Sequence, residues 1–216
     1  MFIDLSHDIE ADMTTYKGLP GPKICDYWTR ESTRVNYDDG SSFQIGRLEM
    51  VGNTGTYIDS PFHRYEHGCD LAGLPLESLA NLESVVVRLP VDELAVGVDA
   101  FAGLNVRGKA VLIATGWDRY WRTEMYYKNH PFLTEAAAKF LASEGATLVG
   151  IDSHNIDDTR LRTRPAHSIL LGADIPICEH LCNLDALGDR RARFSAVPPK
   201  IVGFGTFPVR AFAEII

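Results

Sequence analysis

The clearest hydrophobic periodicity in the chain lies between residues 133 and 145. Apolar residues recur there at intervals of three and four positions, the spacing that gathers side chains on one face of a helix. These residues are Leu133, Ala136, Ala137, Phe140 and Leu141. The pattern predicts a helix that is capped by Thr134 at its start and ended by Gly145.

Apolar runs of strand length lie before and after this helix. They cover residues 83–89, 108–115 and 147–151, and the first contains three consecutive valines, which suit a buried strand. The predicted helix connects the second run to the third. Such a crossover predicts that part of the sheet is parallel.

The remaining pattern is weaker and is punctuated by Gly and Pro. Further strands are expected at residues 1–5, 42–51, 175–178, 200–204 and 210–215, and a short helix at 166–171. The pattern at residues 12–37 predicts a long, partly ordered loop, and the pattern at residues 120–130 predicts a loop or an irregular helix. No repeat, low-complexity tract or linker divides the sequence. We therefore predict a single α/β domain, residues 1–216, with a mixed sheet.

Composition narrows the class of protein. The chain has 45% hydrophobic and 23% charged residues, which is typical of a soluble globular protein, and 216 residues suffice to bury about 70% of the unfolded surface. The net charge of -8 leaves no excess of Lys and Arg to neutralise phosphates. Nucleic acid is therefore not an expected partner.

Cysteine usage and hydropathy bear on location. The cysteines are Cys25, Cys69, Cys178 and Cys182, and no two of them form a Cys-x-x-Cys pair. With an acidic opening segment, this pattern predicts a cytoplasmic protein with reduced thiols. No apolar run approaches the roughly 20 residues that span a bilayer, so no membrane association is expected.

Polar side chains are densest between residues 50 and 68. The residues of interest there are Asn53, Tyr57, Asp59 and His63, which are separated by four, two and four positions, all even intervals. In an extended segment they would share one side, because strand side chains repeat every second residue. A turn-rich loop with capping side chains is the alternative, and the spacing alone does not decide between them.

This stretch resembles the signature of the cyclase-like metal hydrolases, the family of bacterial kynurenine formamidase and isatin hydrolase. The signature is His-x-Gly-Thr-His-x-Asp-x-Pro-x-His. Its Gly, Thr, Asp, Pro and last His are matched by Gly55, Thr56, Asp59, Pro61 and His63. Asn53 and Tyr57 stand where the signature has its first two histidines. Residues 2–7, 70–77, 115–117, 150–153 and 167–172 are also similar to family segments, in order, so the resemblance implies the swivelling β/β/α fold of that family.

The resemblance implies metal ligands as well. In the family, the two histidines and the Asp of the signature hold one divalent ion, and the same Asp with a distant His and Glu holds a second. The second set is complete here as Asp59, His167 and Glu179. The first is not, because an Asn amide is a weak neutral ligand and Tyr ligates well only as phenolate. We expect one divalent metal, Zn²⁺ or Mn²⁺.

The implied reaction is hydrolysis of an amide, N-formyl or cyclic amide bond, as in an arylformamidase. A divalent ion would lower the pKa of bound water toward about 7, and His63 would act as general base and then general acid. Tyr57 and Asn53 would hydrogen-bond the substrate carbonyl or the developing oxyanion. Trp117, at one of the family-like strand ends, is the other expected substrate-binding residue.

A different hypothesis is that the two missing histidines mark a metal-free relative. Such a protein would be either an enzyme that works through Tyr57 and His63 or a small-molecule-binding protein without hydrolase activity. Metal content and a hydrolysis screen would separate these alternatives. In either case the expected partner is a small molecule. The aromatic N-terminal region suggests an arm exchanged between subunits, and the resemblance implies a homodimer or homotetramer.

Overall fold

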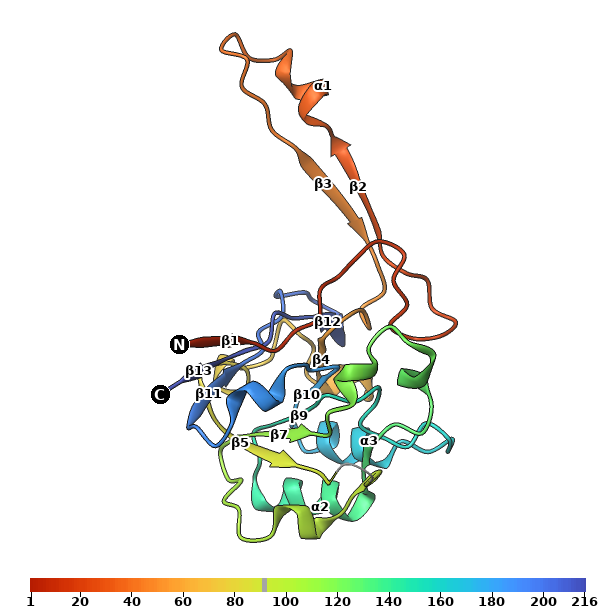
Figure 1. Ribbon diagram of the computed structural model, residues 1–216, viewed down its shortest axis with the longest axis vertical. Helices are drawn as coiled ribbons and strands as arrows, with labels where there is room; N and C mark the ends of the chain where they lie inside the picture. Colours follow the sequence, from red (N-terminus) through yellow and green to blue (C-terminus); the bar gives the residue numbers. More distant parts are fainter. Residues whose placement is uncertain (91–92) are drawn as a thin grey trace.

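A mixed β-sheet forms the centre of the molecule (Figure 1). The computed structural model describes residues 1–90 and 93–216, and within these residues nine strands make one sheet in the order β1-β13-β11-β5-β7-β9-β10-β4-β12. The strands are β1 (Phe2–Asp4), β4 (Tyr57–Asp59), β5 (Leu82–Arg88), β7 (Ala110–Ala114), β9 (Leu148–Ile151), β10 (Ile177–Glu179), β11 (Ala192–Ser195), β12 (Thr206–Pro208) and β13 (Phe212–Ile215). Strands β5, β7, β9 and β10 are parallel and the other pairs antiparallel, so the predicted α/β fold with a mixed sheet is confirmed.

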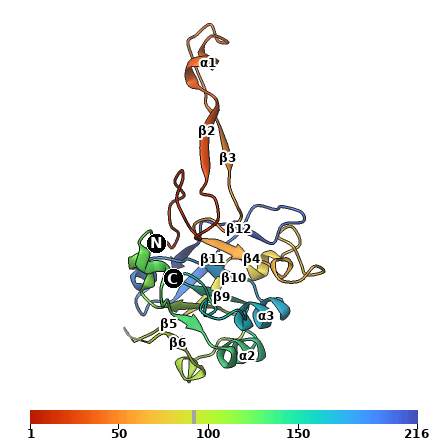
Figure 2. The ribbon, with the colours of Figure 1, turned by 90° about the vertical axis from the view of Figure 1, so that its right-hand side faces the viewer.

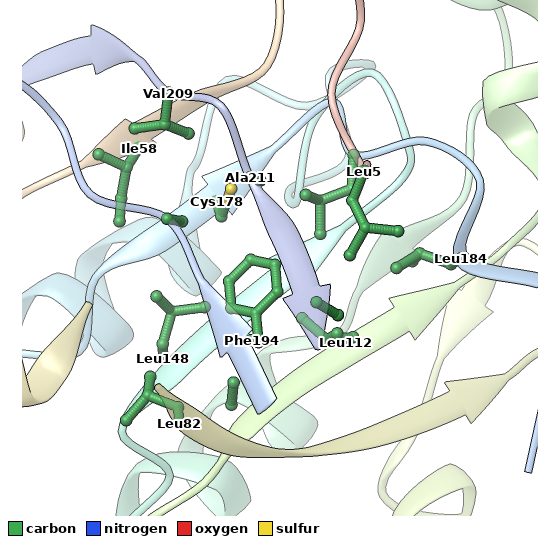
Figure 3. Packing of buried hydrophobic residues seen from close by; sticks show 14 of the residues in the cluster. Leu5, Ile58, Leu82, Leu112, Leu148, Cys178, Leu184, Phe194, Val209 and Ala211 are labelled. Atoms are coloured by element: carbon green, nitrogen blue, oxygen red, sulfur yellow. The ribbon is translucent and has the colours of Figure 1, made fainter. Parts of the chain in front are cut away.

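Both faces of the central strands are buried, which explains their continuous apolar runs. In β7, Leu112 packs into the core on one face of the sheet, whereas Val111 and Ile113 pack into the core on the other. Figure 3 shows the first core, where Phe194 from β11 and Leu5 lie close to Leu112. The second core contains residues of α2 (Glu135–Glu144) and α3 (Pro165–Gly172).

The predicted helix at 134–145 is confirmed as α2. The Thr134 hydroxyl accepts a hydrogen bond from the Ala137 backbone N–H, and Gly145 ends the helix in the left-handed region at φ +77°. One residue of the predicted face is wrong, since Ala136 is exposed and Ala138 is buried in its place. The helix is therefore rotated slightly from the face that the sequence pattern indicated.

Most other predicted elements are present. The runs at 83–89, 108–115 and 147–151 correspond to β5, β7 and β9, and those at 1–5, 166–171, 175–178 and 210–215 to β1, α3, β10 and β13. The prediction of an irregular helix within 120–130 corresponds to a short 3₁₀ helix, η5 (Glu124–Tyr127). The shorter elements are β6 (Ala95–Val96), β8 (Phe132–Leu133), η1 (Pro61–His63), η2 (Leu76–Ser78), η3 (Val98–Phe101), η4 (Trp117–Tyr120) and η6 (Leu184–Leu187).

The strand predicted at 200–204 is wrong. These residues form a turn, and the strand β12 begins later, at Thr206. The turn is held from a distance, because the Asp70 carboxylate accepts a hydrogen bond from the Gly203 N–H at 2.6 Å and Gly203 has φ +70°. Strand β11 was missed, because four residues carry too little alternation to stand out.

The loop predicted at 12–37 is also wrong over much of its length. Strand β2 (Lys23–Trp28) and helix α1 (Arg30–Arg34) lie within it, and β2 pairs with β3 (Ile45–Glu49), inside the strand predicted at 42–51. Together residues 23–49 form a two-stranded arm that projects from the body (Figures 1 and 2). Every residue of β2 and β3 is exposed, including the apolar side chains of Ile24, Tyr27, Trp28, Ile45 and Leu48. Such an exposed apolar ribbon is typical of an interaction surface.

The helices are short. The longest helix in the described part of the chain is α2, with ten residues, and none there has the length and apolar character needed to cross a membrane.

Candidate functional site

The register of three antiparallel strands gathers the polar residues of the signature. Strand β4 lies between β10 and β12, so Tyr57 is opposite Glu179, and Asp59 is opposite Thr206. Tyr57 and Asp59 are two residues apart and share one side of the strand. The Tyr57 hydroxyl donates to Glu179 Oε2 at 2.6 Å, and the Thr206 hydroxyl donates to Asp59 Oδ1. The signature strand thus contributes two of the site's polar groups and positions both against neighbouring strands.

His63 reaches the same place from η1, which Pro61 starts directly after β4. Its Nδ1 lies 2.8 Å from Thr206 Oγ1 and 3.7 Å from Asp59 Oδ1. The Thr206 hydroxyl has one proton, which goes to the Asp59 carboxylate, so His63 Nδ1 must be the donor in the bond with Thr206. In the neutral ring this leaves Nε2 with a lone pair, able to take up a proton or bind a cation.

His167 enters from the start of α3 and is oriented by Asp157. The Asp157 carboxylate lies 2.6 Å from His167 Nδ1 and also accepts from the backbone N–H groups of Ala166 and His167, at 2.7 and 3.1 Å. The buried Asp157 side chain therefore accepts from two backbone N–H groups at the start of α3 and also fixes the orientation of the His167 imidazole. His167 Nε2 then faces Asp59 Oδ2 at 3.6 Å and Glu179 Oε1 at 3.7 Å. A carboxylate behind an imidazole is the usual support of a metal-binding histidine.

The electrostatics of this cluster are those of buried charges in close contact. Burial alone would lower the pKa of His167, but the charge of Glu179, the hydrogen bond to Asp157 and the nearby charge of Asp59 raise it to about 10. Burial raises the pKa of Glu179 to about 7, against the opposing effect of His167. Burial and the charge of Glu179 raise the pKa of Tyr57 well above its ordinary value. Tyr57 therefore stays protonated and is a hydrogen-bond donor rather than a phenolate ligand.

The donor groups fit one divalent cation. Ligating atoms of Asp59, His63 and His167 lie within 4.8 Å of one another. Asp59 Oδ2 is buried and has no hydrogen-bond partner among the described residues, a costly arrangement that a cation would relieve. One carboxylate and two imidazoles suit Zn²⁺ or a similar ion.

Glu179 lies beside this set rather than within it. Its oxygens accept from Tyr57 Oη and, at 2.7 Å, from the Ile156 N–H, although each retains a second lone pair. Ligation by Glu179 stays a prediction. The structure adds His63 to the predicted residues as a third group of ligating type close to Asp59 and His167.

A pocket of about 150 Å³ opens over this cluster. It is lined by Tyr16, Asn53, Tyr57, His63, Arg64, Asn155, Arg164, His167 and Glu179. Five of the seven site residues expected from the sequence thus meet in one pocket, and Asp59 lies buried beneath it.

Trp117 is not among the residues that line this pocket in the described part of the chain. It follows β7, which β9 and β10 separate from β4 in the sheet, and its indole N–H donates to the Tyr126 carbonyl at 3.0 Å. The expectation that Trp117 binds substrate stays a prediction; its strand end lies three positions away from the signature strand in the sheet.

The sequence did not single out several residues of the site. Those that line or support it are Asn155, Asp157, Arg64, Arg164 and Thr206. A signal existed for Asn155 and Asp157, since the buried strand β9 is followed by a run of polar residues. Thr206 had none, because a single threonine is ordinary until the strand register is known.

The comparison with known proteins can now be set beside this geometry. The sequence model of the family described as "Putative cyclase" matches residues 3–158. The chain belongs to the cyclase family. Among curated cyclase relatives, the kynurenine formamidase of Erythrobacter litoralis is 30% identical, covering 89% of this chain and 87% of its own. The kynurenine formamidase of Geobacillus thermodenitrificans is 28% identical over 97% and 95%.

Solved structures support the cyclase fold. A potential metal-dependent hydrolase with cyclase activity is 27% identical, with a TM-score of 0.80 over 99% of this chain and 96% of that one. Isatin hydrolase A from Labrenzia aggregata is 21% identical, with a TM-score of 0.82 over 100% and 93%. The second likeness concerns the fold only.

Proposed function

We propose that this cyclase-family protein is a metal-dependent hydrolase of an amide, N-formyl or cyclic amide bond. The observation that carries the proposal is the unpartnered Asp59 oxygen at the base of a pocket, facing an imidazole that Asp157 holds in the ligating orientation. The kynurenine formamidases among its relatives support the bond type. Hydrolysis would add water across the C–N bond and give a carboxylic acid and an amine.

We assign Asp59 and His167 to one Zn²⁺ or Mn²⁺ ion, and take Glu179, whose Oε1 lies 3.7 Å from His167 Nε2, as the third ligand in place of His63. When bound, the ion would polarise the scissile carbonyl and lower the pKa of water. His63 is the base in this proposal. Its Nδ1 is held by Thr206, so the free Nε2 is the atom that takes the proton from water and returns it to the leaving amine.

The two residues in place of the family's histidines take different roles. The single proton of Tyr57 is committed to Glu179, which makes Tyr57 a positioning residue for that carboxylate. Asn53 lines the pocket, and its amide forms no hydrogen bond with the described residues. Its N–H groups are therefore available to a substrate carbonyl.

The decisive experiment measures metal content and turnover together. Protein purified without chelator is analysed for bound metal and then assayed on formanilide, N-formylkynurenine and isatin, with and without added Mn²⁺ or Zn²⁺. His167→Ala and Glu179→Ala should lose the metal, whereas His63→Ala should keep it and lose turnover. His67→Ala, at an exposed loop histidine, is the matched control.

Other outcomes would point elsewhere. Loss of metal from His63→Ala would make His63 a ligand. Turnover without metal would favour an enzyme that works through Tyr57 and His63. If the protein has no bound metal and no turnover, a binding protein is favoured. That role is consistent with a protonated His167 that neutralises the buried carboxylates by itself.

We also propose that the arm, residues 23–49, mediates a homodimer or homotetramer. A two-stranded ribbon without a covering layer is marginally stable alone, and its apolar side chains are exposed in the single chain. Contact with a second copy would bury them.

A further inference from the structure

Two arginines line the pocket beside the candidate metal site. Arg64 directly follows η1, and Arg164 directly precedes α3. Arg64 Nε donates to Ser168 Oγ at 3.1 Å, and Arg164 Nη1 donates to the carbonyl oxygens of Leu161 and Thr163 at 2.7 and 2.8 Å. Neutral acceptors therefore orient both guanidinium groups and leave most of their N–H donors available.

Neither arginine has a carboxylate partner within residues 1–90 and 93–216. Five of the fifteen arginines in the sequence form a salt bridge within the described residues, so the lack of a carboxylate partner does not by itself set Arg64 and Arg164 apart; their position in the lining of this pocket does. Salt bridges to Asp or Glu are formed by Arg47, Arg88, Arg122, Arg160 and Arg210. The nearby Glu179 is already bonded to Tyr57 and Ile156.

We propose that the substrate of this hydrolase carries a carboxylate away from the scissile bond, and that Arg64 and Arg164 receive it. The inference rests on the proposed function and names its substrate class. Guanidinium groups present paired N–H donors that match a carboxylate, and they keep their charge at any physiological pH. The pocket combines these two positive charges with the Asn53 amide, so its lining offers guanidinium groups to the acid and an N–H donor to the carbonyl.

The size of the pocket limits the substrate to a small molecule. A second cleft of about 320 Å³ shares Asn53 and His63 with it and is also lined by Phe62 and Phe204. An apolar ring between the carboxylate and the scissile amide has aromatic side chains available to contact in this cleft. A small N-acylated amino acid of the aminobenzoate type has all three parts, namely the carboxylate, the apolar ring and the scissile amide.

The test compares matched substrates with and without the charge. The probes are the ortho, meta and para N-formylaminobenzoates and the neutral formanilide. At least one of the acids should be hydrolysed with a kcat/KM about ten-fold or more above that of formanilide. Arg64→Gln should remove roughly ten-fold of kcat/KM for that acid, the effect of losing a charge-assisted hydrogen bond, and change formanilide by less than about three-fold.

Further variants separate charge from folding. Arg164→Lys keeps the charge but loses the paired N–H donors of the guanidinium group, so its kcat/KM for the acid should lie between those of the wild type and Arg164→Gln. Arg162→Gln removes the same charge from the exposed neighbouring loop and should resemble the wild type. If Arg164→Gln does not fold, Arg64→Gln and Arg164→Lys decide the outcome.

Calorimetry with the matching free aminobenzoate gives a readout that does not need turnover. Binding should weaken in Arg64→Gln and at high salt, because the contact is electrostatic. If no probe is hydrolysed but arginine-dependent binding persists, the proposed function fails and the anion site stands. If formanilide and the acids react equally and Arg64→Gln alters neither reaction nor binding, the anion site is overturned while hydrolysis stands.

Discussion

Replacing Asp157 by asparagine keeps the size of the side chain and removes its charge. In the native protein Asp157 accepts hydrogen bonds from Ala166 N, His167 N and His167 Nδ1, at 2.7, 3.1 and 2.6 Å. The asparagine oxygen can still accept from the two backbone groups, which leaves its NH₂ facing His167 Nδ1. The imidazole then carries its proton on Nε2, the atom that faces Asp59 Oδ2 at 3.6 Å.

The expected effect is a weaker metal site with little loss of fold stability. Loss of the carboxylate behind a ligating histidine typically costs 10–100-fold in metal affinity, which is about 1.4 to 2.7 kcal/mol. Competition with a chromophoric chelator measures the affinity for Zn²⁺ and Mn²⁺, and a urea titration measures the stability.

Asp158→Asn is the matched control. Asp158 is the next residue, carries the same charge and pairs with Arg160 outside the site, at 2.8 Å. If Asp157→Asn bound Zn²⁺ as tightly as Asp158→Asn, the assignment of His167 as an oriented ligand would be refuted.

Three further predictions concern the fold, its pH dependence and the arm. Leu141→Ala should destabilise the protein by about 2 to 5 kcal/mol in urea unfolding, because Leu141 is fully buried between α2 and the sheet. A loss of stability below about 1 kcal/mol would contradict that packing. Burial lowers the pKa of His154 to about 3, so as the pH falls below 6.5 the unfolded chain takes up a proton on this residue before the folded chain does. The folded state thereby loses about 2 kcal/mol of stability at pH 5 from this group alone. His154→Phe should reduce the stability difference between urea titrations at pH 7.5 and pH 5 by that amount, and an unchanged difference would count against it. Trp28→Glu together with Leu48→Glu on the arm should shift the protein toward the monomer in light scattering while its circular dichroism stays unchanged. An unaltered mass would exclude these two positions of the arm from the interface.

The local pattern predicted the elements whose own residues determine them. The period of 3.6 residues, Thr134 and Gly145 are enough to define α2. The apolar runs of β5, β7 and β9 are long enough to stand out in the sequence; β7 and β9 are buried throughout, and β5 contributes side chains to both cores. The turn at 200–204 depends on a residue distant in the sequence, because the Asp70 carboxylate accepts a hydrogen bond from the Gly203 N–H.

The site was predictable only as far as the family signature reached. Asp59 and His63 could be found from it, and His167 by its similar segment. The support of these residues depends on strand register and helix placement, which bring Thr206 beside Asp59 and Asp157 behind His167. No local property of Thr206 or Arg164 in the sequence indicates that either one faces the pocket.

The pairing of β1 with β13 joins the two ends of the described chain. Phe2 lies opposite Glu214, and Figure 1 shows the N- and C-termini side by side at one margin of the sheet. During synthesis β1 cannot pair with β13 until β13 has been synthesised, and β4 likewise cannot pair until β10 and β12 have been made. The candidate metal-binding cluster therefore forms only after β12, which contains Thr206, has been synthesised. Contacts so distant along the chain favour slow folding.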